Sequence, residues 1–152
     1  MANTQAMATS FKTELLNAYH NFTATNPART VNTADSFKAA LFLASATINA
    51  STTAFSTTGE VTGTNYTTGG VAISSWNAPS SGGTTAFTTP AASITYTTVT
   101  LSTAFDCVLI YNNSQSNRAV SVHTFGSQTV TAGTFTLTMP TNNSSTALIR
   151  LA

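Results

Sequence analysis

Hydrophobic and polar positions alternate with two different periods along this chain. Near the N-terminus, apolar residues recur at intervals of three or four, the spacing of one face of a helix. These residues are Met7, Phe11, Leu15, Tyr19 and Phe22. The pattern predicts an amphipathic helix from about Gln5 to Phe22. Asn26-Pro27 should end it, because proline disfavours helical geometry in the residue before it.

After residue 34 the period changes to two, which is typical of strands with one buried face. In the stretch from Thr134 to Met139, for example, apolar and threonine side chains alternate. Similar composition predicts strands near Phe37–Leu43, Val71–Trp76, Ile94–Leu101, Phe105–Tyr111, Ala119–Phe125 and Ala147–Leu151. Phe105–Tyr111 is apolar on both faces apart from Asp106, so it should be a central strand covered on both sides.

Irregularities and turns divide these strands. The apolar phase slips from even to odd positions within Ile94–Leu101, which requires a bulge or a strand that changes sheets. Turn residues at Asn112–Asn117, Gly126-Ser127 and Ala132-Gly133 predict consecutive antiparallel hairpins. The threonine-rich stretches 45–70 and 78–91 are predicted to be long ordered loops.

Together these patterns predict a mainly β protein. We expect an antiparallel β-sandwich or jelly-roll-like domain over residues 35–152, preceded by one N-terminal amphipathic helix and a linker over residues 1–34. A length of 152 residues is sufficient for one domain with its own core. The expected core residues are Phe37, Leu41, Val108, Ile110, Val120, Val122, Phe135, Leu137, Met139 and Ile149.

The chain carries very little charge. Only 6% of its residues are charged, against about 25% in a typical soluble domain. The five basic residues are scattered and the net charge is +1, so we expect no nucleic-acid partner. Low net charge also removes repulsion between copies and favours association.

Few residues could support catalysis or metal binding. The only histidines are His20, expected near the end of the helix, and His123, expected on a strand face. Cys107 lies in an apolar run, where a cysteine is usually a small buried hydrophobe. Among the four acids, only Glu60 and Asp106 could plausibly meet, and a buried Asp106 more often accepts backbone hydrogen bonds. We therefore expect a protein that is not an enzyme, with no catalytic residues, cofactor or metal site.

Targeting signals are also missing from the pattern. The N-terminus has no basic region, and the longest apolar run is too short to cross a bilayer. We expect neither a signal peptide nor a membrane partner.

Two sets of aromatic and apolar side chains could bind a partner. The stripe of the N-terminal helix must be covered by its own sheet or by a neighbouring subunit, and the polar linker over residues 23–34 favours the neighbour. Trp76, Tyr66 and Phe87 could form a platform for a sugar or a protein, or Trp76 could be a buried anchor under the loops. The predicted partner interface comprises Met7, Phe11, Leu15, Tyr19, Phe22, Tyr66, Trp76 and Phe87.

Several segments, in order, carry a family resemblance. They are Phe37-Lys38-Ala39-Ala40-Leu41-Phe42, the run from Thr58 to Gly70, Val108-Leu109-Ile110-Tyr111-Asn112, the run from Val130 to Leu137, and Leu148-Ile149-Arg150. The most distinctive string is Gly-Glu-Val-x-Gly-x-x-Tyr-x-x-Gly-Gly at residues 59–70. From about Ser36 to the C-terminus the chain resembles a group of small structural proteins of tailed bacteriophages.

The resemblance implies a non-enzymatic virion protein, made in the host cytoplasm. We expect a head decoration (cement) protein that contacts neighbouring subunits. The alternatives are a component of the neck, tail or fibre, or a carbohydrate-binding adhesin module. The implied partners are further copies of the chain, with a trimer as a possible assembly, and other virion proteins such as the major capsid protein.

Overall fold

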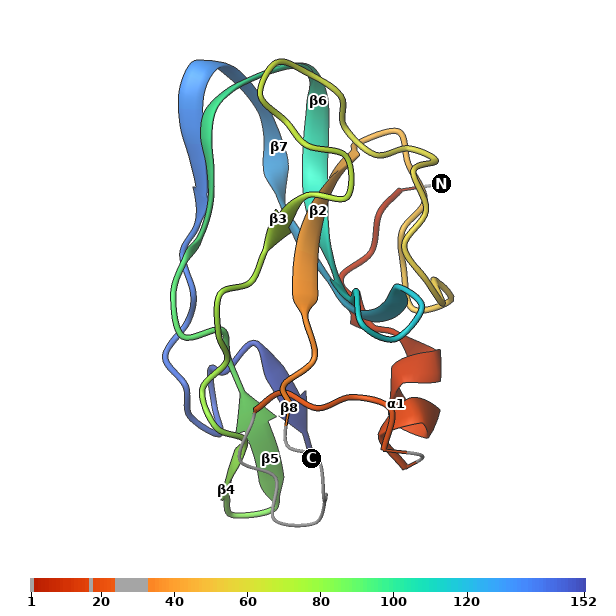
Figure 1. Ribbon diagram of the computed structural model, residues 1–152, viewed down its shortest axis with the longest axis vertical. Helices are drawn as coiled ribbons and strands as arrows, with labels where there is room; N and C mark the ends of the chain where they lie inside the picture. The colour runs from red at the N-terminus through yellow and green to blue at the C-terminus, as the bar shows by residue number, and fades with distance from the viewer. Residues whose placement is uncertain (1, 17, 24–32) are drawn as a thin grey trace.

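Two long strands dominate the computed structural model, which describes residues 2–16, 18–23 and 33–152. Strand β6 (Ile94–Asn112) pairs antiparallel with β7 (Arg118–Leu137) from end to end. A tight turn at residues 113–117 joins them, as expected. The β6–β7 ribbon arches over at the top of Figure 1, so that its outer half, residues 94–101 and 128–137, folds back over its inner half, residues 105–125.

Irregular pairing produces this arch. The register between β6 and β7 shifts repeatedly from Tyr96 to Cys107, and Thr98 has a φ of 53°. The predicted irregularity within Ile94–Leu101 is therefore confirmed. By contrast, Gly126-Ser127 and Ala132-Gly133 are not hairpin turns, because both lie inside β7. Bulges bend a strand without ending its pairing, so the segments predicted as separate strands merge into two long ones.

The ribbon belongs to a five-stranded antiparallel sheet with the order β1-β7-β6-β2-β3. Its other strands are β1 (Ala6–Met7), β2 (Phe37–Leu43) and β3 (Val71–Ala72). Both faces of β2 are buried: Ala39 and Leu41 contact the outer half of the ribbon, and Ala40 and Phe42 contact the opposite core cluster. The central sheet is therefore covered on both sides.

A second, three-stranded sheet lies at the bottom of Figure 1, with the order β4-β5-β8. It comprises β4 (Ser80–Gly82), β5 (Thr85–Thr88) and β8 (Ile149–Leu151). The sequence predicted a loop over residues 78–91, and that prediction is wrong for β4 and β5. These strands are short, and β4 is polar, so they have no hydrophobic period to recognise.

The expected fold class is confirmed at the coarse level. The chain is mainly β with antiparallel sheets, consistent with a β-sandwich. The jelly-roll arrangement stays a prediction. Of the ten expected core residues, seven are buried; the exceptions are Phe135, Leu137 and Met139, which pack against the core while partly exposed.

The N-terminal helix is shorter than predicted. Helix α1 covers Thr9–Leu16, and the residues before it form β1, in which Ala6 and Met7 pair with Val122 and Ser121 of β7. The helix does not extend to Phe22 because Ala18 has a φ of 55°, outside the helical region. Of the expected linker, residues 24–32 lie outside the described residues.

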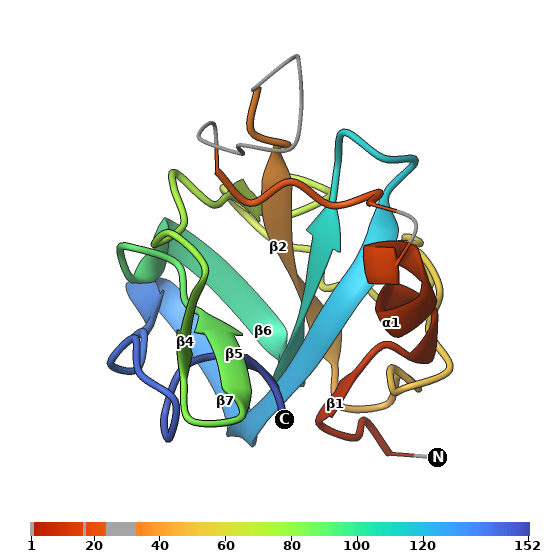
Figure 2. The ribbon, with the colours of Figure 1, turned by 90° about the horizontal axis from the view of Figure 1, so that it is seen from below.

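The helix packs on its own chain. Phe11 is 0% exposed and belongs to the same core cluster as Val120 and Val122 of β7. Figure 2 shows α1 lying against β7. The expectation that a neighbouring subunit covers the apolar stripe is therefore wrong for Phe11: the sheet of the same chain buries it.

Candidate functional site

The structure brings together four of the eight predicted interface residues. Phe11, Leu15 and Phe22 from the N-terminal segment and Phe87 from β5 line one apolar groove of about 170 Å³. Ala86, Ile149 and Leu151 of the small sheet complete its wall. The groove lies where the N-terminal segment meets the small sheet.

The remaining four residues lie elsewhere. Trp76 is only 8% exposed and packs in the core, where its ring centroid lies 4.8 Å from that of Phe22. Met7 is half-buried on β1 and lines a different groove, beside β8. Tyr19 is 41% exposed and packs against the Arg118 guanidinium, 4.4 Å from its ring centre. Tyr66 is half-buried against the other core cluster.

The aromatic platform suggested by the sequence is therefore not assembled. Trp76 packs in the cluster that contains Phe37 and Phe11, whereas Tyr66 stacks on Tyr96 in the cluster under the arch. Of the two interpretations of Trp76, the structure favours the buried anchor. Proximity in the sequence did not predict proximity in space, because β2 separates the two clusters.

A buried polar cluster joins the N-terminal segment to the ribbon. His20 Nε2 lies 2.8 Å from Glu14 Oε2, and Asn112 Nδ2 lies 3.0 Å from His20 Nδ1. This arrangement fits the neutral imidazole with its proton on Nε2, donating to Glu14 and accepting from Asn112. Arg118 forms an ion pair with Glu14 at 2.6 Å. Each member of the cluster thus has a partner within the chain.

Asp35 extends this cluster. Its Oδ2 accepts hydrogen bonds from Asn112 Nδ2 at 2.7 Å and from the backbone N–H of Asn21 at 2.9 Å. Asn21 also accepts a hydrogen bond from the Asp35 backbone N–H. The cluster resembles an acid–histidine pair, but among the described residues no serine or threonine hydroxyl and no cysteine thiol is hydrogen-bonded to His20. Its geometry fits a clamp between segments rather than an activated nucleophile.

Glu60 holds the loop of residues 59–70 against β2. It is 6% exposed, and its Oε1 accepts hydrogen bonds from Tyr66 Oη at 2.8 Å and from the Gly69 N–H at 2.7 Å. Burial raises the pKa of Glu60, and these two hydrogen bonds oppose the rise. Tyr66 Oη in turn accepts from the Leu41 N–H at 3.0 Å. Through Tyr66, the loop thus accepts a hydrogen bond from a backbone N–H at the edge of β2.

The glycines of this loop are required by close packing. Gly70 has a φ of 71°, and a Cβ placed there would lie 1.8 Å from the Ala39 carbonyl oxygen. At Gly63 a Cβ would lie 2.0 Å from the Thr100 carbonyl oxygen. The glycines of residues 59–70 therefore have an architectural role, because they let the loop lie across β2 and onto β6.

Cys107 and Asp106 are consecutive residues of β6. Cys107 is buried, and burial together with the nearby Asp106 raises the pKa of its thiol to about 12, so it stays protonated. Asp106 Oδ1 accepts a hydrogen bond from Asn3 Nδ2 at 2.5 Å. Asp106 and Glu60, the pair considered from the sequence, thus bind different segments of the chain.

Within the described part of the chain, no group of three or more His, Cys, Asp or Glu residues could hold a metal ion. Across the same residues, no helix is long and apolar enough to cross a membrane.

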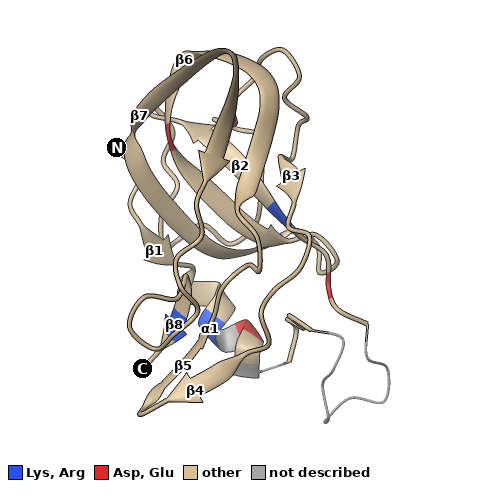
Figure 3. Ribbon diagram, turned by 90° about the vertical axis from the view of Figure 1, so that its left-hand side faces the viewer, with Lys and Arg blue, Asp and Glu red and all other residues tan. Residues whose placement is uncertain are grey.

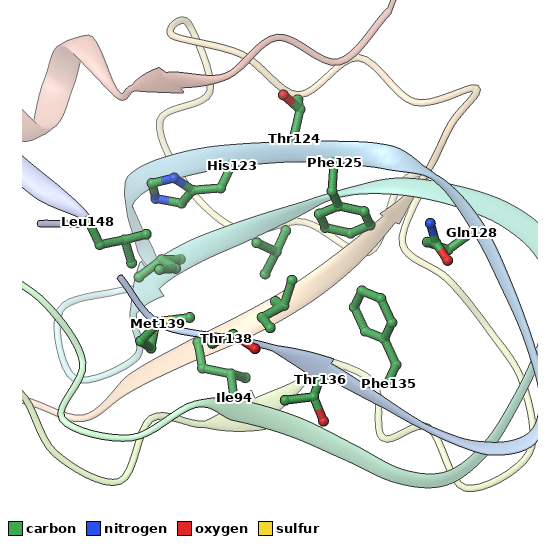
Figure 4. A pocket seen from close by; sticks show the side chains of 13 residues that line it. Ile94, His123, Thr124, Phe125, Gln128, Phe135, Thr136, Thr138, Met139 and Leu148 are labelled. Carbon is green, nitrogen blue, oxygen red and sulfur yellow. The ribbon is translucent and has the colours of Figure 1, made fainter. Parts of the chain in front are cut away.

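The sequence did not predict an apolar cavity of about 270 Å³ that lies between the two halves of the ribbon. Figure 4 shows His123 and Phe125 on one limb of β7, and Phe135 and Thr136 on the other. The ring centroids of Phe125 and Phe135 lie 5.3 Å apart. The alternation of apolar and polar residues over 119–139 indicates which side chains point inwards. It does not predict the arch, which brings the two halves of β7 face to face.

Burial in this cavity lowers the pKa of His123 to about 4, and burial also lowers the pKa of His20. The folded state therefore favours neutral imidazoles, whereas the unfolded chain takes up protons near pH 6.5. Stability should be complete above pH 6.5 and should fall as the pH drops towards 4. For His123, acidification from pH 7 to pH 5 should cost up to about 2 kcal/mol.

Urea unfolding of the wild type and of His123→Gln at pH 7 and pH 5 tests this expectation. The difference between the two proteins isolates His123, because the carboxylates contribute equally to both. His123→Gln should lose less stability on acidification. Equal losses in both proteins would show that His123 is hydrated and titrates normally.

The chain was compared with protein-family models, curated proteins and solved structures, and no match was found in any of the three.

Proposed function

We propose that this chain is a non-enzymatic structural component of a tailed-phage virion, and specifically a head decoration protein that contacts neighbouring subunits. The observation that carries the proposal is the use of the acidic side chains. All four carboxylates, Glu14, Asp35, Glu60 and Asp106, accept hydrogen bonds from the chain itself. Each one fastens a loop or terminal segment to the sheet, so the scarce charge of the chain serves its architecture.

The loop of residues 59–70 also supports the proposal. Its distinctive residues have packing and hydrogen-bonding roles: Glu60 and Tyr66 bind the edge of β2, and Gly70 allows contact with Ala39. A motif of this kind suits a protein selected for a rigid shape. It is also the string on which the resemblance to phage structural proteins depends most.

A position in the neck, tail or fibre remains the second candidate, because the same architecture would serve there. The carbohydrate-binding alternative loses its main argument, since Trp76 is buried and Tyr66 lies in a different cluster. Association with further copies of the chain and with the major capsid protein stays a prediction of the proposal.

Quantitative mass spectrometry of purified particles tests the proposed function. Particles of the virus that carries this gene should contain the protein, and hundreds of copies per particle would indicate head decoration. A dozen copies or fewer would place it in the neck or tail and overturn the decoration role. Its absence from particles that contain the other virion proteins would refute a virion function altogether.

A further inference from the structure

The outer limb of β7, residues 128–137, has one open edge. On one side it pairs with β6, from Phe105↔Gln128 to Ile94↔Leu137. On the other side, within the part of the chain that the structure describes, no strand pairs with it, because β1 reaches only Ser121 and Val122. We call this row of backbone groups the β7 edge.

The opposite edge of the ribbon, on the β6 side, is covered by a loop. There, Thr64 and Thr100 exchange two backbone hydrogen bonds of 3.1 Å, and Asn65 Nδ2 donates to the Thr98 carbonyl. The loop of residues 59–70 thus closes the β6 side of the outer half. The β7 edge has no such cover, so its unpaired N–H and C=O groups are available to another strand.

The β7 edge carries neither of two common protections against pairing, charge and proline, although a bulge between Val130 and Gly133 bends the strand. Monomeric proteins commonly place lysine, other charges or proline on exposed edge strands. Here no Asp, Glu, Lys or Arg occurs from Ala119 to Ile149, and the first proline, Pro140, comes after the end of β7. Figure 3 shows no charged residue along the outer half of β7, residues 128–137.

Apolar surface lies beside this edge. The cavity between the limbs is bordered by Phe125, Phe135 and Met139, which are partly exposed. A strand added along residues 128–137 would extend the outer wall of that cavity and shield these side chains from water. Backbone pairing and apolar cover would therefore act together.

We propose that the β7 edge pairs antiparallel with the β7 edge of a second copy of this chain, around a twofold axis. The strand suits self-pairing because no like charges meet when it faces itself, and its exposed face carries Thr129, Thr131, Thr134 and Thr136. Cross-strand threonine pairs and β-branched residues stabilise such a ladder. The net charge of +1 adds almost no repulsion between copies.

The proposed function includes contact between copies of this chain, and the β7 edge supplies a surface for that contact. The inference therefore rests on that part of the proposed function. Pairing of an edge with itself gives a dimer, so the geometry favours a twofold contact over the trimer suggested by the sequence. Purified protein is sufficient for the test. A failure here is thus distinct from absence of the protein from virus particles.

Sedimentation over a range of protein concentrations, with Thr131→Lys/Thr134→Lys as the variant, tests the edge. The wild type should form dimers, and the variant should raise the dimer dissociation constant at least tenfold, because charges oppose each other across the new ladder. The matched control is Thr95→Lys/Thr97→Lys, which places the same charges at exposed positions on β6, one strand in from the β7 edge, where Thr95 lies across from Thr136. The control should remain dimeric.

Three results would overturn the proposal: a monomeric wild type at about 100 µM, a trimer, or equal weakening by the control pair. The last result would mean that copies meet through the threonine face instead of the edge. Thermal unfolding of each variant, measured alongside, separates loss of association from loss of folding.

Disulfide cross-linking locates the axis. Single cysteines at Thr129, Thr131, Thr134 or Thr136 should form intermolecular disulfides most efficiently at one position, where the strand crosses its own symmetry mate. Cys107 is buried and should give no background. Equal or absent cross-linking at all four positions would contradict a twofold β7 contact.

Discussion

Replacing Phe11 with alanine is expected to lower the free energy of unfolding by about 3–5 kcal/mol. Phe11 is fully buried, its ring lies 4.7 Å from the His20 ring, and it packs in the core cluster beside β7. Truncation would leave a cavity next to the buried polar cluster of Glu14 and His20, which cannot collapse without breaking hydrogen bonds. Urea unfolding followed by circular dichroism measures the loss.

Tyr19→Ala is the matched control, because Tyr19 lies in the same segment but is 41% exposed. It should cost less than about 1 kcal/mol. A loss below 1 kcal/mol for Phe11→Ala would indicate that the N-terminal segment does not dock on its own sheet. Such a result would revive the interpretation in which a neighbouring subunit covers the helix.

Gly70→Ala is the second substitution with a large expected effect, a loss of about 2–5 kcal/mol in the free energy of unfolding. A non-glycine residue with a left-handed backbone costs about 1–2 kcal/mol, and forcing atoms into a packed site costs about 1–3 kcal/mol more. Here the added Cβ would overlap the Ala39 carbonyl oxygen, which belongs to the backbone and has little room to move. Thermal and urea unfolding should both report the loss.

Gly83→Ala separates the two contributions. Gly83 also has a positive φ, 61°, but a Cβ there would have no neighbour within 4 Å. Only the backbone cost should appear, about 1–2 kcal/mol. Equal losses at Gly70 and Gly83 would mean that the loop of residues 59–70 moves away from β2 without penalty, contrary to its assigned role.

The central strands could be predicted because a strand buried on both faces is apolar over several consecutive residues. Strand β2 has the predicted bounds Phe37–Leu43, since its residues are apolar apart from Lys38. The phase slip within Ile94–Leu101 was also readable, because one displaced residue moves every later side chain to the other face. In both cases neighbouring residues in the sequence carry the whole signal.

The ends of the helix and the path of the ribbon depended on distant residues. The helical period of the first segment includes Met7 and Phe22, yet Met7 pairs with Ser121, and Phe22 stacks on Phe37. Tertiary contacts therefore replaced helical ones at both ends of α1. Similarly, glycines at 126 and 133 indicate a turn locally, and only the continued pairing with β6 keeps them in a strand.

The candidate interface was predictable as a set of apolar residues but not as a surface. Phe11 and Phe87 belong to one groove, although many residues separate them in the chain. Tyr66 was singled out as an aromatic contact, but its hydroxyl is engaged with Glu60 and β2. The β7 edge had a compositional signal, the long uncharged run, whose meaning depends on knowing which strand lies at the border of the sheet.

The docking of the N-terminal segment on β7 has a consequence for biosynthesis. His20 contacts Asn112 across 92 residues of chain, and Glu14 contacts Arg118 across 104. Glu14 and His20 therefore leave the ribosome well before the partners that they bind, whereas the β6–β7 hairpin can begin to close once its own turn and the start of β7 have been made. The nascent chain should complete its ribbon first and fasten its N-terminus last.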